Sequence, residues 1–180
     1  YDANEQNSIS LNAKIGQWEF DRRIDSDMKN ADSQDSSQFF LRTESFLIKN
    51  RYISGDMAYR HDFSQEGHEL DMSIYYSHIK NETPNHIEVI EKDAIGLSVT
   101  FESQNYQVQS NANRNDIEFK SDYTLPLGGQ IRLECGFLHD FKSSLTDYLY
   151  ESKSAETGWQ SNSDYSGQVD FKRWVTSIYT

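Results

Sequence analysis

The feature that most constrains this chain is a pair of alternating stretches, one on each side of a sharp turn, between Ile117 and Phe141. Apolar residues lie two or four positions apart in both stretches: Ile117, Phe119, Tyr123 and Leu125, then Ile131, Leu133, Cys135, Phe137 and Phe141. Charged residues fill the alternate positions: Glu118, Lys120, Asp122, Arg132, Glu134 and Asp140. Because successive side chains of a strand point to opposite faces, the pattern predicts a β-hairpin with one apolar and one charged face.

The turn of this hairpin is the stretch 126–129, which reads Pro-Leu-Gly-Gly. Proline presets φ, and glycine permits the positive φ that a reversal requires. A long β-rich run is predicted over 38–63, and its end contributes to a second hairpin of the same kind over 52–78, around the turn 64–67. In the stretch 8–21 the apolar phase changes near Gly16, which predicts a β-bulge that keeps Trp18 and Phe20 on the face of Ile9. With a further strand over 165–180, the chain is expected to contain about six strands.

Three polar stretches, 25–37, 81–114 and 143–164, are expected to be long connections, the second with strand-like arms because Ile95, Leu97, Val99 and Phe101 alternate within it. Long connections would then alternate with the tight turns 64–67 and 126–129. This asymmetry is typical of outer-membrane barrels, which have short periplasmic turns and long extracellular loops. The predicted fold is all-β, an antiparallel up-and-down meander forming part of a transmembrane β-barrel. The whole chain, 1–180, is expected to be a single segment of that barrel, without a plug domain.

Composition excludes several classes of protein. A formal net charge of -12 argues against nucleic-acid binding, which requires a basic surface. No apolar run is long enough for a transmembrane helix, although alternating strands of a membrane barrel would escape such a search. Cys135 is the only cysteine, so it is expected to be a small apolar residue of the hairpin. Because the chain starts without a methionine and stops within an alternating run, it is interpreted as a piece of a longer protein.

Candidate chemical sites are few, and no motif of a catalytic or nucleotide-binding site is present. His61 and His68 flank the turn 64–67 and could approach a metal, but an interfacial position is favoured. Acidic residues of the stretch 25–37 could hold calcium, but a solvated loop is favoured because the glycine and terminal glutamate of an EF-hand are missing: Asp25, Asp27, Asp32 and Asp35. Glu118 and Asp122 are interpreted as lumen charges rather than as an acid–base pair. No catalytic residue, metal or cofactor is therefore expected.

Several segments, in order along the chain from residue 52 onward, together resemble a known family. They are Tyr59-Arg60-His61-Asp62-Phe63, Gly67-His68-Glu69-Leu70, Asp122-Tyr123, Pro126-Leu127, Glu134-Cys135-Gly136-Phe137, Asp147-Tyr148 and the closing stretch Phe171 to Tyr179. This set resembles the outer-membrane β-barrel region of the TonB-dependent receptor-like proteins of Bacteroidetes. The resemblance implies a 22-stranded barrel, closed by a plug, that imports a scarce ligand with energy from the TonB complex.

The chain departs from this family pattern because it contains no candidate plug and too few strands to close a barrel. We therefore expect it to supply wall strands and extracellular loops to a larger receptor. Its expected partners are outer-membrane lipid, the remainder of the barrel with its plug, the TonB complex and an unknown small ligand. Tyr148, Tyr150 and Trp159, placed in the expected loop 143–164, are the candidate ligand-binding residues.

Two alternatives remain open from the sequence. The first is a soluble β-sandwich, such as a carbohydrate-binding module, in which the apolar faces would pack against each other. The second is a small, self-contained eight-stranded outer-membrane barrel, for which the length is nearly sufficient.

Overall fold

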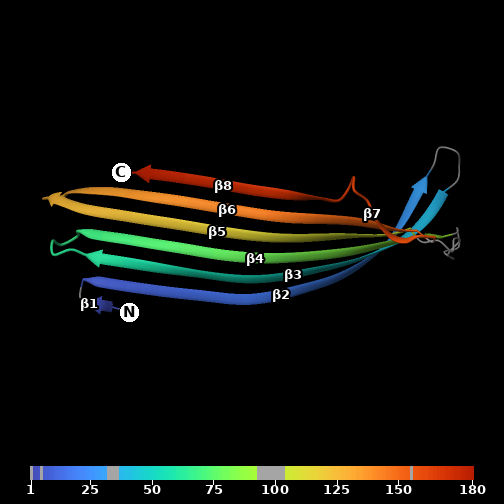
Figure 1. Cartoon of the computed structure of the whole chain (residues 1–180), viewed down its shortest axis with the longest axis horizontal. Coiled ribbons are helices and arrows are strands. Elements are labelled where there is room, and N and C mark those ends of the chain that lie inside the picture. The colour runs from blue at the N-terminus through green and yellow to red at the C-terminus, as the bar shows by residue number, and fades with distance from the viewer. Residues whose placement is uncertain (1, 5, 32–36, 93–103, 155) are drawn as a thin grey trace.

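The described strands form one antiparallel sheet (Figure 1). The computed structural model describes residues 2–4, 6–31, 37–92, 104–154 and 156–180. The strands are β1 (Asp2–Asn4), β2 (Asn7–Ala31), β3 (Ser37–Asp62), β4 (Glu69–Lys92), β5 (Gln104–Gly128), β6 (Ile131–Ser154), β7 (Gly158–Ser161) and β8 (Gly167–Tyr179). From β1 to β6 each strand pairs with the next, and both β7 and β8 pair with β6. A helix long and apolar enough to cross a membrane is absent from these residues.

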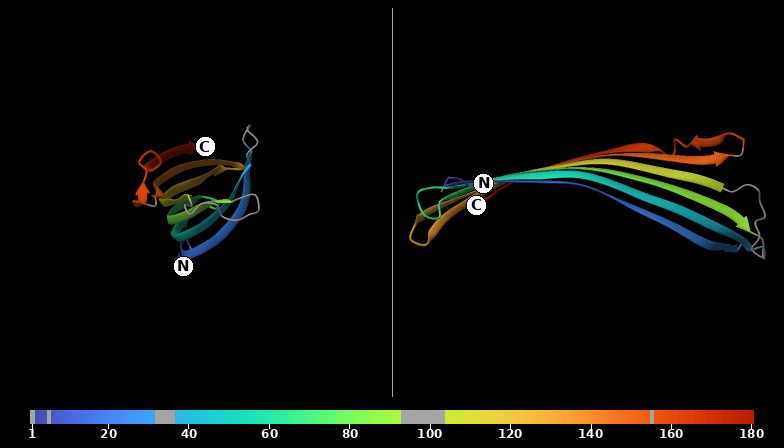
Figure 2. Two further views of the ribbon diagram at one scale, coloured as in Figure 1. Left: turned by 90° about the vertical axis from the view of Figure 1, so that its right-hand side faces the viewer. Right: turned by 90° about the horizontal axis from the view of Figure 1, so that it is seen from below.

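The antiparallel meander predicted from the sequence is confirmed. Six of the strands are long, and the other two, β1 and β7, have 3 and 4 residues. In the described part of the chain the sheet does not close, because β8 pairs only with β6 and β2 meets only the short β1 on its other side. Seen end-on, the sheet curls into an arc (Figure 2). Nothing described packs across it, so the sandwich alternative finds no second sheet.

Four strands, β2, β4, β5 and β6, are much longer than the sequence predicts, whereas β3 and β8 correspond to the predicted β-rich run 38–63 and the predicted strand 165–180. β2 to β6 each have 24 to 26 residues, so most of the stretches expected to be loops is strand. The predicted loop 25–37 is strand up to Ala31, the connection 81–114 is strand up to Lys92 and from Gln104, and the loop 143–164 is strand up to Ser154. Residues 32–36 and 93–103, which include Ile95, Leu97, Val99 and Phe101, lie outside the described residues. Polar stretches remain extended here because neighbouring strands hydrogen-bond to their backbones.

Pro84 contributes to the misleading appearance of the stretch 81–114. It lies inside the central strand β4, where proline cannot donate a backbone hydrogen bond. The pairing of β3 with β4 accordingly omits Leu47 and Ile48, which lie opposite Pro84 and Thr83. On the other side β4 pairs with β5 without a break, including Pro84 with Gln109. The proline therefore interrupts one ladder locally without ending the strand.

The β-bulge predicted at Gly16 is wrong. β2 and β3 keep one register from Asn7 opposite His61 to Ala31 opposite Ser37. Gly16 lies directly opposite Tyr52, whose ring occupies the space where a Cβ would lie, with its hydroxyl oxygen 2.5 Å from that position. The glycine accommodates a cross-strand aromatic ring, an arrangement used in sheets to stabilise glycine positions. Since no residue is inserted, Trp18 and Phe20 lie on the face opposite Ile9.

The two predicted tight turns lie at the same end of the sheet (Figure 1). Gly128 and Gly129 have φ of 103° and 64°, which confirms the need for glycine in the turn 126–129. In the other turn, the Phe63 amide donates to the His68 carbonyl over 2.9 Å, and Gly67 has φ of 75°. The Gln65 side chain donates to the Pro126 carbonyl over 3.0 Å and so connects the two turns.

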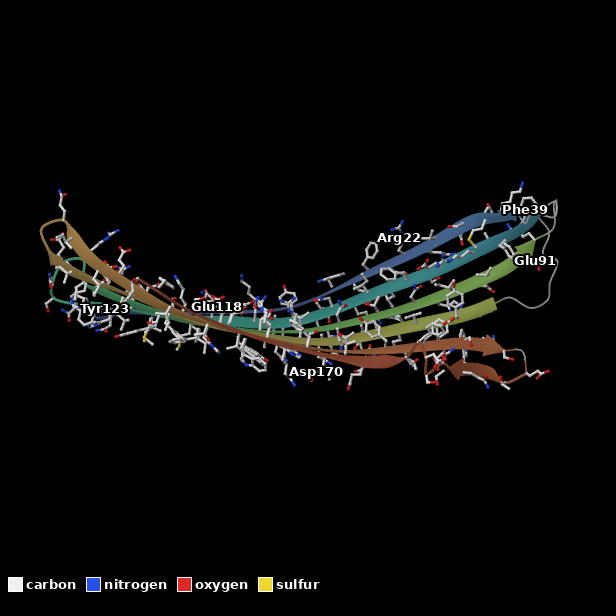
Figure 3. All side chains as sticks on the ribbon, turned by 90° about the horizontal axis from the view of Figure 1, so that it is seen from above. Arg22, Phe39, Glu91, Glu118, Tyr123 and Asp170 are labelled. Carbon is white, nitrogen blue, oxygen red and sulfur yellow. The ribbon has the colours of Figure 1, made fainter. Side chains whose placement is uncertain are left out.

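Two names describe the length of the sheet. The turn-side half comprises residues 7–15, 53–62, 69–77, 116–128, 131–142 and 173–179, and the loop-side half comprises the remaining residues of the six long strands together with β7. Figure 3 places Tyr123 and Glu118 in the turn-side half and Arg22, Phe39 and Glu91 in the loop-side half. Two further names describe its surfaces. The Phe119 face is the surface that carries Phe119 and, in the other strands, the residues that share its face through the register. The Glu118 face is the opposite surface, which carries Glu118.

Candidate functional site

The Phe119 face of the turn-side half is apolar and carries no Asp, Glu, Lys or Arg among the described residues. Its apolar members are Ile9, Leu11, Ala13, Ile15, Ile53, Met57, Tyr59, Leu70, Met72, Ile74, Tyr76, Ile117, Phe119, Tyr123, Leu125, Ile131, Leu133, Cys135, Phe137, Phe141, Trp174 and Ile178. Several of them are widely exposed, including Leu11 at 76% and Ile131 at 68%. A soluble sheet would cover such a surface, so it requires an apolar environment.

Polar side chains within this apolar face are paired with each other. His139 lies 2.8 Å from the Thr176 hydroxyl, and His61 lies 2.8 Å from the Asn7 side-chain oxygen. The Tyr59 hydroxyl also donates to Asn7, over 2.6 Å. Pairing of this kind reduces the cost of placing polar groups in a medium without water.

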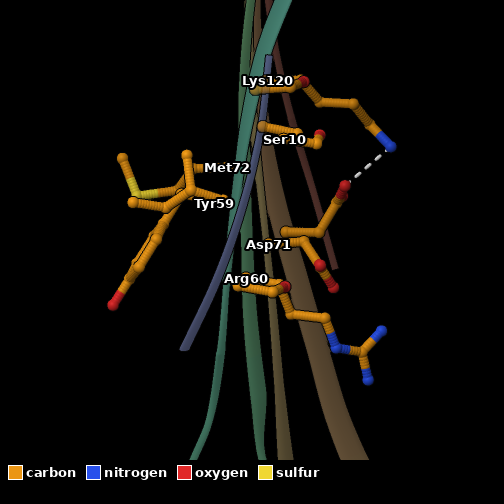
Figure 4. Close-up of a pocket in the computed structure, with 11 residues that line it drawn as sticks. Ser10, Tyr59, Arg60, Asp71, Met72 and Lys120 are labelled. Carbon is orange, nitrogen blue, oxygen red and sulfur yellow. Dashed lines mark ion pairs between the residues drawn. The ribbon is translucent and has the colours of Figure 1, made fainter. Parts of the chain in front are cut away.

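The Glu118 face of the turn-side half is covered by ion pairs. Figure 4 shows Tyr59 and Met72 on one side of the sheet and Ser10, Arg60, Asp71 and Lys120 on the other. Lys120 contacts Asp122 at 2.6 Å, and Arg60 contacts Glu69 at 2.8 Å. The hollow drawn in the figure is lined by residues of both faces and is open, so it does not form an enclosed ligand site. This surface suits water, as the lumen of a barrel would provide.

Further along the same face, Asp140 contacts Arg173 at 2.9 Å and Lys142 at 3.5 Å. Gly136 is buried beneath the ring of Tyr179, which lies directly opposite it in β8 and whose hydroxyl donates to Asp122. The same glycine–tyrosine arrangement therefore occurs twice on the Glu118 face, near opposite edges of the sheet, with Gly16 and Tyr52 in β2 and β3 as the other pair.

In the loop-side half the two faces exchange their character. The Phe119 face becomes charged, with ion pairs such as Arg23 with Asp25 at 3.3 Å and Lys80 with Glu82 at 2.7 Å. Its scattered apolar residues include Phe39, Leu41, Leu47, Ile90, Leu145, Leu149 and Trp159. The Glu118 face instead becomes mainly apolar and aromatic, with Trp18, Phe20, Ile24, Met28, Phe40, Phe46, Ile48, Tyr52, Ile79, Ile87, Val89, Tyr106, Val108, Tyr148, Tyr150, Val169 and Phe171. Ile87, at 5% exposure, is the one buried large apolar side chain in the described part of the chain.

The three candidate ligand-binding residues do not all lie on one face of the sheet. Tyr148 and Tyr150 belong to β6 rather than to a loop, and both lie on the aromatic Glu118 face. The Tyr150 ring lies 6.0 Å from Tyr106 in a stacked arrangement and 5.3 Å from Tyr165. Trp159 lies in β7 on the opposite face, where its ring is 5.7 Å from that of His86. Sequence reasoning missed Tyr106 and Tyr165 as neighbours of Tyr150, because their proximity depends on how the chain folds back along β6.

Among the described residues, the histidines and aspartates considered as possible metal ligands have other partners in the structure. The Phe63 ring lies between His61 and His68, with centroids 4.4 and 3.8 Å away, and the His68 ring nitrogen Nε2 lies 2.8 Å from the Tyr123 hydroxyl. Asp25 accepts a hydrogen bond from Thr43 over 2.7 Å. Asp27 pairs with Lys92 at 3.2 Å, whereas Asp32 and Asp35 lie outside the described residues. Within the described ranges, no group of three or more His, Cys, Asp or Glu side chains could hold a metal ion.

Long antiparallel strands with an uncharged apolar band on one face, opposite a charged surface, define the wall of a membrane β-barrel. Residues 61–180 match the Outer membrane protein beta-barrel family, and the chain belongs to this family. Its location is accordingly the outer membrane, and its environment includes membrane lipid. A comparison with curated proteins finds no match.

Proposed function

We propose that this chain is a segment of the barrel of a TonB-dependent receptor of the Bacteroidetes type, which imports a small ligand across the outer membrane. The observation that carries this proposal is the open sheet, in whose described part the outer side of β2 meets only the short β1 and β8 pairs only with β6. Unpaired edges cannot face lipid, because their backbone groups would lack hydrogen-bond partners. Further strands of a larger barrel would pair with both edges, and a plug would occupy its lumen.

In this proposal the chain has a binding and structural role and is not an enzyme. The apolar band of the Phe119 face contacts lipid, and the charged Glu118 face of the turn-side half contacts the water of the lumen. Tyr148 and Tyr150 contact the ligand from inside the loop-side half. Trp159 contributes from the outer side of the rim, since it lies on the other face.

Two measurements on the complete protein, purified from outer membranes, test the proposal separately. A folded barrel should migrate faster than the boiled sample in a detergent gel. A protein that remains soluble without detergent would contradict the barrel assignment. The folded sample should also be retained by the immobilised periplasmic domain of TonB from the same organism, with the boiled sample as the control. Faster migration without retention would leave the barrel standing and reject TonB-dependent uptake.

A further inference from the structure

The apolar band of the Phe119 face has a definite height. In β6 it runs from Ile131 to Phe141, and in β5 from Ile117 to Leu125. Strands rise about 3.3 Å per residue, so the β6 segment, tilted by roughly 40° as in outer-membrane barrels, spans about 28 Å. The lipid-facing apolar band of such barrels is roughly 25 Å tall. The turn-side half alone is therefore sufficient to cross the bilayer.

All five strands from β2 to β6 continue well beyond this band. A transmembrane strand needs about 9–11 residues, whereas these strands have 24 to 26. Beyond the band the Phe119 face carries acidic residues in several strands, including Glu19, Asp21, Glu82, Asp147 and Asp170. Carboxylates on a lipid-facing surface would be strongly destabilising, so hydrocarbon cannot cover this part of the wall.

We propose that the bilayer covers only the turn-side half of the Phe119 face, and that the loop-side half stands outside the membrane as an extension of the barrel with its Phe119 face in water. The inference rests on the barrel location and not on the uptake function. It explains why the two faces exchange character at the same level in every long strand. The outer surface passes from hydrocarbon to water, and the inner surface passes from a charged, wet surface to a mainly apolar and aromatic one.

Cations on the Phe119 face mark the proposed boundary. Arg51 lies one step beyond Ile53 on β3 and pairs in register with Lys80 on β4, and Lys49 follows one step further. A hydrogen bond from Lys80, assisted by the charges of Arg51 and Lys49, lowers the pKa of Glu82 below its usual value. Lys172 lies one step beyond Trp174 on β8. Cations at this level are suitably placed for the phosphates of lipid headgroups, while their long aliphatic stems can lie along the apolar band.

The boundary can be tested with two spin labels on one strand and one face. The complete protein, with Cys135→Ala, is labelled at Leu11→Cys or at Arg23→Cys and reconstituted in phosphatidylglycerol-containing vesicles. Both side chains lie on the Phe119 face of β2, and both are well exposed, Leu11 at 76% overall and the Arg23 side chain at 68%. Collision rates with oxygen, which concentrates in lipid, and with a water-soluble nickel chelate then report the surroundings of each label. Asn12→Cys, on the other face, is the control for the wet lumen.

We expect the Leu11 label to collide mainly with oxygen and the Arg23 label mainly with the nickel chelate, with a several-fold difference in their ratio. Oxygen-dominated collisions at both positions would overturn the inference by placing the whole wall in lipid. Nickel-dominated collisions at both positions would overturn it by removing lipid from the turn-side half. Faster gel migration of each unheated labelled sample verifies folding, and Ile15→Cys replaces the Leu11 variant if that variant does not fold.

Discussion

The turn-side and loop-side halves of this sheet share the same six long strands, the same registers and the same backbone ladders, yet their two surfaces have opposite characters. In the turn-side half Phe119 and Leu133 lie on an uncharged face, and Lys120 and Glu134 lie opposite them. In the loop-side half most of the charges, such as Glu82, lie on the Phe119 face, and most of the aromatic rings, such as Tyr150, lie on the Glu118 face. The difference teaches that β-pairing fixes only which residues share a face, while the solvent at each level of the wall selects their polarity.

The strongest test of this difference places one charge on the Phe119 face at two levels of β5. Phe119→Arg puts a cation in the lipid band and is expected to cost about 2–4 kcal/mol of unfolding free energy. Urea unfolding of the complete protein in lipid vesicles, followed by tryptophan fluorescence, measures this. Gln109→Arg, on the same strand and face in the loop-side half, is the control and should change stability by less than about 0.5 kcal/mol. Equal losses in the two variants would remove the distinction between the halves.

A smaller loss is expected from filling the space above a glycine in the turn-side half. Gly136→Val would place methyl groups where the Tyr179 ring lies, so the ring must move. Overpacking of this kind typically costs about 1–3 kcal/mol. The same urea unfolding measures it. Gly167→Val in the loop-side half is the matched control, since no atom lies within 4 Å of its Cβ position. A Gly136 variant as stable as the control would show that the tyrosine does not require the glycine.

The aromatic surface of the loop-side half should also stabilise the wall, although less strongly. Tyr150→Ala removes contacts with the Tyr106 and Tyr165 rings, and such aromatic pairs contribute about 1 kcal/mol each beyond burial. The unfolding midpoint in urea should fall. Leu149→Ala changes the adjacent residue on the water-facing side, where Leu149 is 38% exposed, and should have the smaller effect. The opposite ranking would contradict an apolar interior behind this half.

The smallest effect is expected for an exposed ion pair of the loop-side half. Lys172 pairs with Asp170 at 2.9 Å, and both side chains are about half exposed. Lys172→Met should cost between about 0 and 1 kcal/mol, a loss that disappears at high salt. Arg173→Met, its neighbour on the other face, leaves Lys142 as the remaining ionic partner of Asp140 among the described residues and should cost more. Melting temperatures at low and high salt would contradict this if the first loss exceeded the second.

Prediction from the sequence succeeded where apolar and polar residues alternate strictly and each face of the strand keeps the same surroundings. Ile117 to Phe141 was correctly predicted as a hairpin, because its apolar period and its Pro-Leu-Gly-Gly turn agree. It failed where the phase reversed. At Gly16 the change of phase suggested an inserted residue. The register in fact stays constant, and the apolar side chains beyond Gly16 lie on the opposite face of the sheet. In the stretch 81–114, Pro84 and many amides suggested a connection, whereas backbone pairing with β3 and β5 keeps most of it extended.

The candidate ligand residues show the same division. Tyr148 and Tyr150 are two positions apart, so the sequence alone requires them to share a face if they lie in a strand. That they do lie in a strand, that Tyr106 is beside Tyr150, and that Trp159 is on the other face depend on the pairing of β5, β6 and β7.

What the sequence by itself determined is the class of the protein: amphipathic antiparallel strands, tight turns at one end and an apolar surface suited to lipid. Local periodicity carries this information, because each strand must place its apolar residues on one side within a few positions. Only the tertiary structure decided how far the strands extend and at which level the two faces exchange. Those properties depend on residues far apart in the chain, such as Ile15, Ile53 and Trp174, reaching the same level of the sheet through register.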